Sequence, residues 1–177
     1  MRVQLEESTS PTVIRSVHEG HADVGLFVLG DEPPDLEVFP YHDDLMVVIT
    51  PTGHPLEGAD AVCFAETLDY EYIGLHEDAV LQLVNAASVA KRRLRLRMQV
   101  SNCDAMCAMV GAGLGIGIVP RNAIRAYEAS QRIKLIPLSE PWARRELKVG
   151  IRSYDSLQTS AKLLVDHLVQ RKDRTGR

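Results

Sequence analysis

Two short polar stretches carry side chains that could hold a small ligand. Ser8-Thr9-Ser10 follows the predicted strand Val3–Leu5, and Ser101-Asn102 follows the strand-like residues that end at Val100. Each stretch precedes a predicted helix, whose free N–H groups and dipole favour anions. Thr50 ends a further apolar run, and we expect it near the same cleft. The ligand-site residues expected from the sequence are Ser8, Thr9, Ser10, Thr50, Ser101 and Asn102. The alternative for the two polar stretches, Ser8-Thr9-Ser10 and Ser101-Asn102, is that their side chains only cap helices, a role worth about 1 kcal/mol each.

The cysteines and histidines give weaker signals for chemistry. Cys103 and Cys107 lie four residues apart on one helix face and could form a redox or metal pair. A disulfide within a regular helix is geometrically awkward, and no His or second Cys pair lies nearby in the sequence to complete a zinc site. We interpret them as small buried thiols. A triad built on Ser8 would lack the G-x-S-x-G elbow. We therefore expect no catalytic residue, no metal site and no cofactor.

The segment Ser101–Pro120 contains the elements that position the second polar stretch. Its order is a polar cap, a helix over Ala105–Val110, a turn at Gly111-Ala112-Gly113 and a strand over Leu114–Val119. Its glycines resemble a nucleotide fingerprint, but such a motif follows a strand and opens a helix, which is the reverse of this order. We expect the glycines to permit close packing of the helix against the strand.

Helices and strands alternate along the rest of the chain, which predicts an α/β fold with mostly parallel sheets. The other strands are predicted at Ala22–Leu29, Leu36–Tyr41, Leu45–Thr50, Tyr70–Leu75, Leu94–Met98, Ile133–Pro137 and Arg145–Ser153. The other helices are predicted from Ser10 to Gly20 and at Cys63–Leu68, Asp78–Arg92, Arg121–Ser130 and Leu157–Gln170. The continuous apolar run Leu45–Thr50 suits a strand buried on both faces of a parallel sheet. His42-Asp43-Asp44 predicts a polar break before it, Gly30–Pro34 a loop and Arg171–Arg177 a disordered tail.

Length and charge restrict the classes of function. A chain of 177 residues can bury a sizeable core. Its net charge of −4 argues against direct contact of this segment with nucleic acid. The sequence has neither an apolar stretch near the ~20 residues that span a bilayer nor a signal-peptide pattern. Three cysteines without the spacing of a secreted scaffold indicate a reducing cytoplasm.

The run S-N-x-D-A-M-x-x-M-V-G-A-G-L-G-I-G-I-V-P resembles the effector-binding domain of LysR-type transcriptional regulators. Three other stretches agree with that family in order and spacing. They are Leu5–Ser10 followed by Val17–Leu26, Leu45–Thr50 followed by Pro51 and His54-Pro55-Leu56, and the closing strand Leu147–Ile151. The resemblance covers nearly the whole chain.

The resemblance implies two Rossmann-like lobes joined by two crossover segments, as in periplasmic-binding proteins of type 2. Lobe one would comprise residues 1–42 plus 139–177, and lobe two residues 43–138. Family members place effector-contacting polar residues at both polar stretches, one in each lobe. They also carry a strand and a helix ahead of the segment that starts here at Arg2, and a helix-turn-helix further upstream. We therefore expect an N-terminally truncated chain, in which lobe one is compromised or another segment fills the gap.

The function implied by the resemblance is a cytoplasmic, non-enzymatic sensor. A small organic effector, such as a carboxylate, would bind between the lobes and control transcription in a homodimer or homotetramer. DNA would be contacted through a helix-turn-helix domain outside this segment. A solute-binding receptor of the periplasmic type is the main alternative, and the lack of an export signal argues against it. An enzyme on the same lobes is a third possibility, without an acid–base pair to support it.

Overall fold

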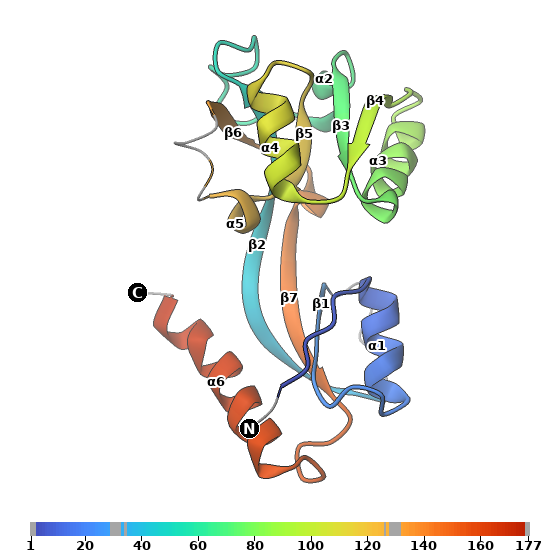
Figure 1. The fold of residues 1–177 in the computed structure, drawn as a ribbon, viewed down its shortest axis with the longest axis vertical. Coiled ribbons are helices and arrows are strands. Elements are labelled where there is room, and N and C mark those ends of the chain that lie inside the picture. Colours follow the sequence, from blue (N-terminus) through green and yellow to red (C-terminus); the bar gives the residue numbers. More distant parts are fainter. Residues whose placement is uncertain (1–2, 29–32, 34, 126, 128–131, 176–177) are drawn as a thin grey trace. The chain divides into compact units, whose positions relative to one another are not determined.

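The computed structural model describes residues 3–28, 33, 35–125, 127 and 132–175, and the side chains of 78 and 170–175 lie outside this description. The chain divides into two compact units. Unit 1 comprises residues 1–43 and 145–177, and unit 2 comprises residues 44–144. The chain crosses from one unit to the other within strand β2 (Glu37–Pro51) and at the start of strand β7 (Arg144–Ile151) (Figure 1).

Unit 2 contains strands that run in both directions. Strands β3 (Glu71–Leu75) and β4 (Arg95–Val100) are parallel, whereas β2 pairs antiparallel with β5 (Gly117–Pro120) and with β6 (Ile133–Pro137). A parallel bridge between Tyr72 and Ile116 links β3 to the segment that leads into β5. The parallel pairing predicted for Leu45–Thr50 is therefore wrong. Burial on both faces does not fix the direction of a strand, because helices can cover either kind of sheet.

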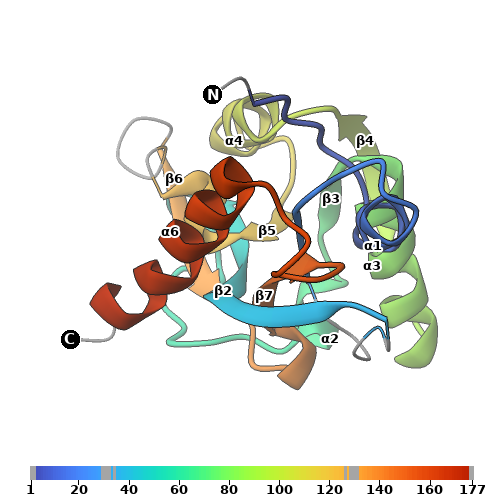
Figure 2. The same cartoon turned by 90° about the horizontal axis from the view of Figure 1, so that it is seen from below.

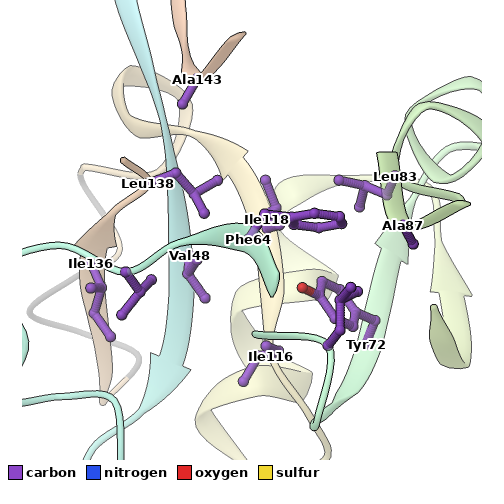
Figure 3. Packing of buried hydrophobic residues seen from close by; sticks show 12 residues of the cluster. Val48, Phe64, Tyr72, Leu83, Ala87, Ile116, Ile118, Ile136, Leu138 and Ala143 are labelled. Carbon is purple, nitrogen blue, oxygen red and sulfur yellow. The ribbon is translucent and has the colours of Figure 1, made fainter. Parts of the chain in front are cut away.

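The side chains of these strands alternate between two apolar clusters, as the two-residue period of a strand requires. Val48, Tyr72 and Ile118 belong to one cluster, together with residues of α2 (Phe64–Thr67) and α3 (Glu77–Val89) (Figure 3). Val47, Ile49, Ile73 and Val119 belong to the other cluster, together with residues of α4 (Cys103–Gly111) and α5 (Arg121–Ile124). Helices therefore cover both faces of the strands in unit 2. Figure 2 shows α3 alongside β3.

Helix α4 packs tightly against the strand that follows it. A Cβ at Gly117 would lie 2.8 Å from the Met106 sulfur and 3.2 Å from Ile49 Cγ1. Gly113 has a φ of +77°, as expected of a glycine that ends a helix. The predicted close packing of the helix against the strand is confirmed at Gly117, whereas an added Cβ at Gly113 would meet nothing within 4 Å. The strand is shorter than predicted, because β5 begins only at Gly117.

Unit 1 is built around a short antiparallel sheet with two helices. Helix α1 (Ser10–His18) packs on strand β1 (Gly25–Val28), where a Cβ on Gly25 would lie 2.8 Å from side-chain atoms of both Val13 and Val17. Strand β1 pairs antiparallel with β7, which neighbours β2. Helix α6 (Thr159–Thr175) contributes Val165 to a core with Val149 and Ile151.

Several predicted elements have different bounds or do not form. Residues 3–9 form no strand, and Val3 and Leu5 are 59% and 91% exposed, so the short apolar alternation there covers no core. The predicted break at residues 42–44 is wrong, because β2 runs through it as one strand of 15 residues. Helix α3 begins at Glu77 rather than capping on Asp78.

The remaining differences concern the ends of helices. Helix α6 begins at Thr159 and reaches Thr175, so the prediction of disorder from residue 171 is wrong up to that point. The arginines and lysine of this stretch are good helix formers. Helix α5 ends at Ile124, and residues 126 and 128–130 of the predicted helix lie outside the described residues. The same holds for residues 30–32 and 34 of the predicted loop and for Leu29.

Two fully buried threonines differ in their hydrogen bonds, so we expect valine substitutions at them to have opposite effects on the free energy of unfolding. The Thr50 hydroxyl has no hydrogen-bond partner among the described residues, whereas Thr67 donates to the Phe64 carbonyl oxygen at 2.5 Å and also hydrogen-bonds Tyr72. We expect Thr50→Val to raise the free energy of unfolding by about 1 kcal/mol and Thr67→Val to lower it by about 1–2 kcal/mol. Thermal unfolding of both variants measures the difference. A Thr50→Val protein that melts below the parent would contradict the assignment.

Candidate functional site

Two parallel strands of unit 2 end side by side at one edge of their sheet. Leu75, the last residue of β3, pairs with Val100, the last residue of β4. The His76 N–H continues this pairing by donating to the Val100 carbonyl oxygen at 3.1 Å. Helix α3 begins immediately after His76, and α4 begins two residues after Ser101. Ligands of α/β proteins bind at such carboxyl ends of strands, where helix N-termini converge.

A shallow hollow of about 520 Å³ opens at this edge. It is lined by His76, Glu77, Gln99, Val100, Ser101 and Ala105. The hollow therefore presents a hydroxyl, an amide and an imidazole beside one carboxylate, and no lysine or arginine is among its described lining residues. Such a set can hydrogen-bond the hydroxyl and carbonyl groups of a small polar molecule. A ligand anion would be favoured here by the two helix dipoles rather than by a side-chain cation.

His76 occupies an unusual backbone conformation at the rim of the hollow. Its φ is +53° and its ψ is 155°, although it carries a side chain. Non-glycine residues rarely adopt positive φ, and such strain of order 1–3 kcal/mol gathers at ligand sites. The carbonyl oxygen of His76 also accepts the Val80 N–H at 3.1 Å, so the strained residue is fixed at both its N–H and its C=O.

Ser101 and Asn102 lie at this edge but have different structural roles. Asn102 is the N-cap of α4, and its Oδ1 accepts the Ala105 N–H at 2.8 Å. The capping interpretation therefore applies to the Asn102 oxygen. Ser101 is exposed and lines the hollow, which makes its hydroxyl available to a ligand.

The three predicted residues of the first polar stretch belong to unit 1. Ser8 and Thr9 are exposed, and the Thr9 hydroxyl donates to the Thr12 hydroxyl at 3.0 Å. Thr9 is the N-cap residue of α1 without a cap bond from its side chain. Ser10 is half-buried, and its Oγ accepts the Val28 N–H at 3.1 Å, which ties α1 to β1. One ligand contacting both this stretch and Ser101 stays a prediction.

Thr50 does not lie at the edge that carries Ser101. Strand β2 is antiparallel to β5, and the bridge between Tyr72 and Ile116 is parallel, so β2 runs opposite to β3. Its carboxyl end therefore lies where β3 begins. Thr50 is also 0% exposed. The antiparallel pairing of β2 therefore separates Thr50 from Ser101, and a contact of Thr50 with a ligand stays a prediction.

The sequence prediction missed His76, Glu77 and Gln99 as lining residues. A signal for two of them was present in the sequence. His76 and Glu77 follow one predicted strand as Ser101 follows another, and both junctions lead directly into helices. The sequence predicts the start of this helix at Asp78, one residue after its start in the structure, so the equivalence of the two junctions is not apparent from the sequence. Gln99, in β4, continues the alternation of Arg93, Arg95 and Arg97, which predicts its exposure but not its place beside His76 in the hollow.

The opposite edge of unit 2 has a smaller hollow of about 320 Å³ with paired charges. Arg97 forms an ion pair with Glu71 at 2.9 Å, and Arg95 donates to the Asp69 carbonyl oxygen at 3.0 Å. The ring centroids of His54 and Tyr70 lie 4.5 Å apart. Burial lowers the pKa of His54. His54 also accepts the Leu56 N–H within the turn. These contacts give His54, Arg95 and Arg97 structural roles at this edge.

Cys103 and Cys107 lie on α4, and neither forms a disulfide bond. Cys107 is buried, and burial, with Cys103 and Asp104 nearby, raises its thiol pKa to about 11. A thiol that stays protonated is a poor nucleophile and a poor metal ligand. Among the described residues, no group of three or more His, Cys, Asp or Glu side chains could hold a metal ion.

Comparison with known sequences decides the family. The sequence signature described as "LysR substrate binding domain" matches residues 1–173. The chain belongs to this family. As a LysR substrate-binding domain it is expected to have the fold of type 2 periplasmic-binding proteins, and its mixed α/β structure agrees with that fold.

Curated relatives of this LysR substrate-binding domain are transcriptional regulators. It is 29% identical over 166 residues to the uncharacterized HTH-type transcriptional regulator YwbI of Bacillus subtilis, covering 93% of this chain and 55% of that protein. It is 25% identical over 158 residues to a probable RuBisCO transcriptional regulator of Synechocystis, covering 84% and 46%. The chain thus spans about half the length of the curated relatives it matches. These relatives favour a regulator over a solute-binding receptor.

Solved structures of similar fold contain small ligands. The regulatory domain of Synechocystis CcmR in complex with 2-PG gives a TM-score of 0.77 at 19% identity, covering 96% of this chain and 82% of that one. The effector-binding domain of QuiR in complex with shikimate gives 0.72 at 20% identity, covering 94% and 79%. The BenM effector-binding domain with benzoate gives 0.74 at 17% identity, covering 99% and 80%. These likenesses establish the fold.

Proposed function

We propose that this chain is the effector-sensing part of a LysR-type transcriptional regulator. The observation that carries the proposal is the hollow at the ends of β3 and β4, where the N-termini of α3 and α4 meet in a chain of this family. The proposed role is binding without catalysis, in the cytoplasm, in a homodimer or homotetramer. DNA contact would be made by a helix-turn-helix outside residues 1–177. Among the described residues, no helix is long and apolar enough to cross a bilayer.

The proposed effector is a small organic molecule, with carboxylates as the first class to test. Helix N-termini supply N–H donors and a favourable dipole for a carboxylate, and the Ser101 hydroxyl adds a further donor. Glu77 would oppose an anion placed directly beside it, so the carboxylate is expected nearer to Ser101 than to Glu77. We propose Ser101 and His76 as the contacts in unit 2, and Ser8 and Thr9 as contacts in unit 1.

Sensing requires more than tight binding. An effector changes the conformation of a protein only if it binds one conformation better than another, and equal binding to both shifts no population. The proposed mechanism is that the effector favours one conformation of the domain, which the oligomer passes on to its DNA-binding parts. The strained backbone at His76 is a candidate for the element whose conformation differs, because a ligand could supply the interactions that offset the strain.

A thermal-shift screen of the purified chain tests this function. A ligand that binds only the folded state at a hundredfold excess over its Kd should raise the unfolding free energy by about 2.7 kcal/mol. For a domain of this size that corresponds to roughly 5–10 °C in Tm. The panel contains small carboxylates, amino acids and aromatic acids. A cooperative melt that no member of the panel shifts would count against the carboxylate class.

Substitutions at the two polar stretches then locate the site. We expect Ser101→Ala and Thr9→Ala to weaken binding of a hit by about three- to tenfold, the value of one hydrogen bond, while Tm without ligand changes little. Ser88→Ala is the matched control in unit 2, because the Ser88 hydroxyl donates to the Val84 carbonyl oxygen within α3, away from the hollow. If both site variants bind the hit as tightly as the parent, the assignment of these residues is wrong.

A further inference from the structure

The segment that carries the chain out of unit 2 is held by its own set of contacts. The Ser139 N–H donates to the Val62 carbonyl oxygen at 3.0 Å, and the Val62 N–H donates to the Pro137 carbonyl oxygen at 3.0 Å. Ala143 is 0% exposed and belongs to the same apolar cluster as Phe64 and Leu138 (Figure 3). Residues 139–143 are thus packed into unit 2 although they lead directly to β7.

Glu140 provides the polar part of this attachment. One of its carboxylate oxygens, Oε1, accepts the N–H of Phe64, the first residue of α2, across 76 positions of sequence. A carboxylate at a helix N-terminus makes a charge-assisted hydrogen bond, which is about twice as strong as a neutral one. The short helix η1 (Pro141–Ala143) follows at once, and the Ala143 N–H donates to the Glu140 carbonyl oxygen at 3.0 Å. Glu140 therefore links α2 and η1 through both its side chain and its backbone.

The second carboxylate oxygen of Glu140 is buried and has no hydrogen-bond partner among the described residues. Burial raises the pKa of Tyr72, and the nearby Glu140 carboxylate raises it further. The Tyr72 hydroxyl cannot serve as the missing donor. Thr67 donates its one hydroxyl proton to the Phe64 carbonyl oxygen, so Tyr72 must donate to Thr67 in their shared hydrogen bond. The position of Glu140 is thus fixed mainly by the Phe64 N–H.

An aromatic contact also holds residues 139–143 to α2. Trp142 meets Phe64 edge to face, with ring centroids 5.7 Å apart and an interplanar angle of 83°. Phe64 is 4% exposed, whereas Trp142 is 42% exposed. Aromatic pairs in this geometry add about 0.5–1.5 kcal/mol beyond the area that they bury. Phe64 therefore receives both Glu140, at its backbone, and Trp142, at its ring.

We propose that Glu140 is a clasp that fixes residues 139–143 to α2, so that these residues move as part of unit 2. Bending of the chain at this crossover then begins at Arg144 and not in the proline-containing connector before it. Glu140 thus has a positioning role, and Trp142, the chain's only tryptophan, is an internal reporter of the clasp. The clasp does not depend on the identity of the effector.

Hydrogen exchange on the whole chain, without ligand, tests the clasp. In the parent protein the amides of Ser139 and Ala143 should exchange as slowly as core amides of unit 2 such as Val48, since they open only with that core. In Glu140→Ala the Phe64 amide should exchange about tenfold faster, and acrylamide should quench Trp142 fluorescence more strongly. Glu140→Gln keeps the accepting oxygen and should restore both readouts most of the way.

Two controls separate the clasp from a general loss of stability. Glu7→Ala removes an exposed glutamate of unit 1 and should change neither readout. If Glu140→Ala lowers the stability of the whole unit, the Val48 amide will exchange faster along with the Phe64 amide. In that case the test rests on the slow exchange of the amides at 139 and 143 in the parent protein and on the recovery of both readouts in Glu140→Gln. Parent amides at 139 and 143 that exchange as fast as the exposed residue Glu7 would overturn the proposal. So would unchanged Phe64 exchange and unchanged Trp142 quenching in Glu140→Ala.

Discussion

Gly115→Ala is expected to lower the free energy of unfolding by about 3 kcal/mol. Gly115 has a φ of +155°, which side chains rarely adopt, and an added Cβ would lie 2.6 Å from the Glu71 carbonyl oxygen. That oxygen cannot move aside freely, because it accepts the Ile116 N–H at 2.9 Å. The same short segment links β3 to β5 through the Tyr72–Ile116 bridge. The substitution therefore strains the junction between β3 and the segment that leads into β5.

Thermal unfolding measures this effect as a fall in Tm of roughly 6–12 °C, at 2–4 °C per kcal/mol for a domain of this size. Gly113→Ala and Gly58→Ala are the matched controls. Gly113 also has positive φ, at +77°, but an added Cβ would meet nothing within 4 Å, so only the backbone strain of about 1–2 kcal/mol is expected. Gly58 has open space and no positive φ, and its substitution should be nearly neutral. Equal losses at Gly115 and Gly113 would show that the contact with Glu71 costs nothing.

Cys107 is expected to react with iodoacetamide at least about a hundredfold more slowly in the native protein than in the unfolded chain at pH 8. Burial raises the pKa of this thiol to about 11 from an ordinary value of 9.0. At pH 8 about one thiol in a thousand is then ionised, against about one in ten in the unfolded chain, and only the thiolate reacts. Its complete burial slows access further. The native rate should rise about tenfold for each pH unit up to about 11.

Mass spectrometry of labelled Cys107 in a Cys103→Ser background measures this rate without interference from the neighbouring thiol. Cys63, which is half-buried, serves as the internal comparison. The raised pKa also has a consequence for stability. Because the unfolded chain releases this proton first, the stability from the protonated thiol is complete below pH 9 and declines as the pH rises toward 11. Native labelling as fast as labelling in denaturant would contradict the buried, protonated state.

Local sequence patterns determined most of the individual elements in this protein. Asn102 and the glycines after Val110 predict the start and the end of α4, and its cap bond to Ala105 is found in the structure. The apolar runs at β2, β3 and β6 predict strands, because a short continuous apolar run is typical of a strand that is buried on both faces. The motif in residues 101–120 also predicted the family, which the match over residues 1–173 confirms.

Tertiary structure alone decided the direction of the strands and the membership of the site. A buried strand has the same composition in either direction, so the sequence predicts parallel pairing for Leu45–Thr50, whereas the antiparallel pairing of β2 puts Thr50 at the edge opposite Ser101. The separation of Glu140 from Phe64 by 76 residues likewise hides their hydrogen bond from any local pattern. Local rules describe what each residue prefers within one or two turns of chain. Which distant residues become neighbours depends on how the strands pair, and that pairing made His76 and Gln99 part of the hollow.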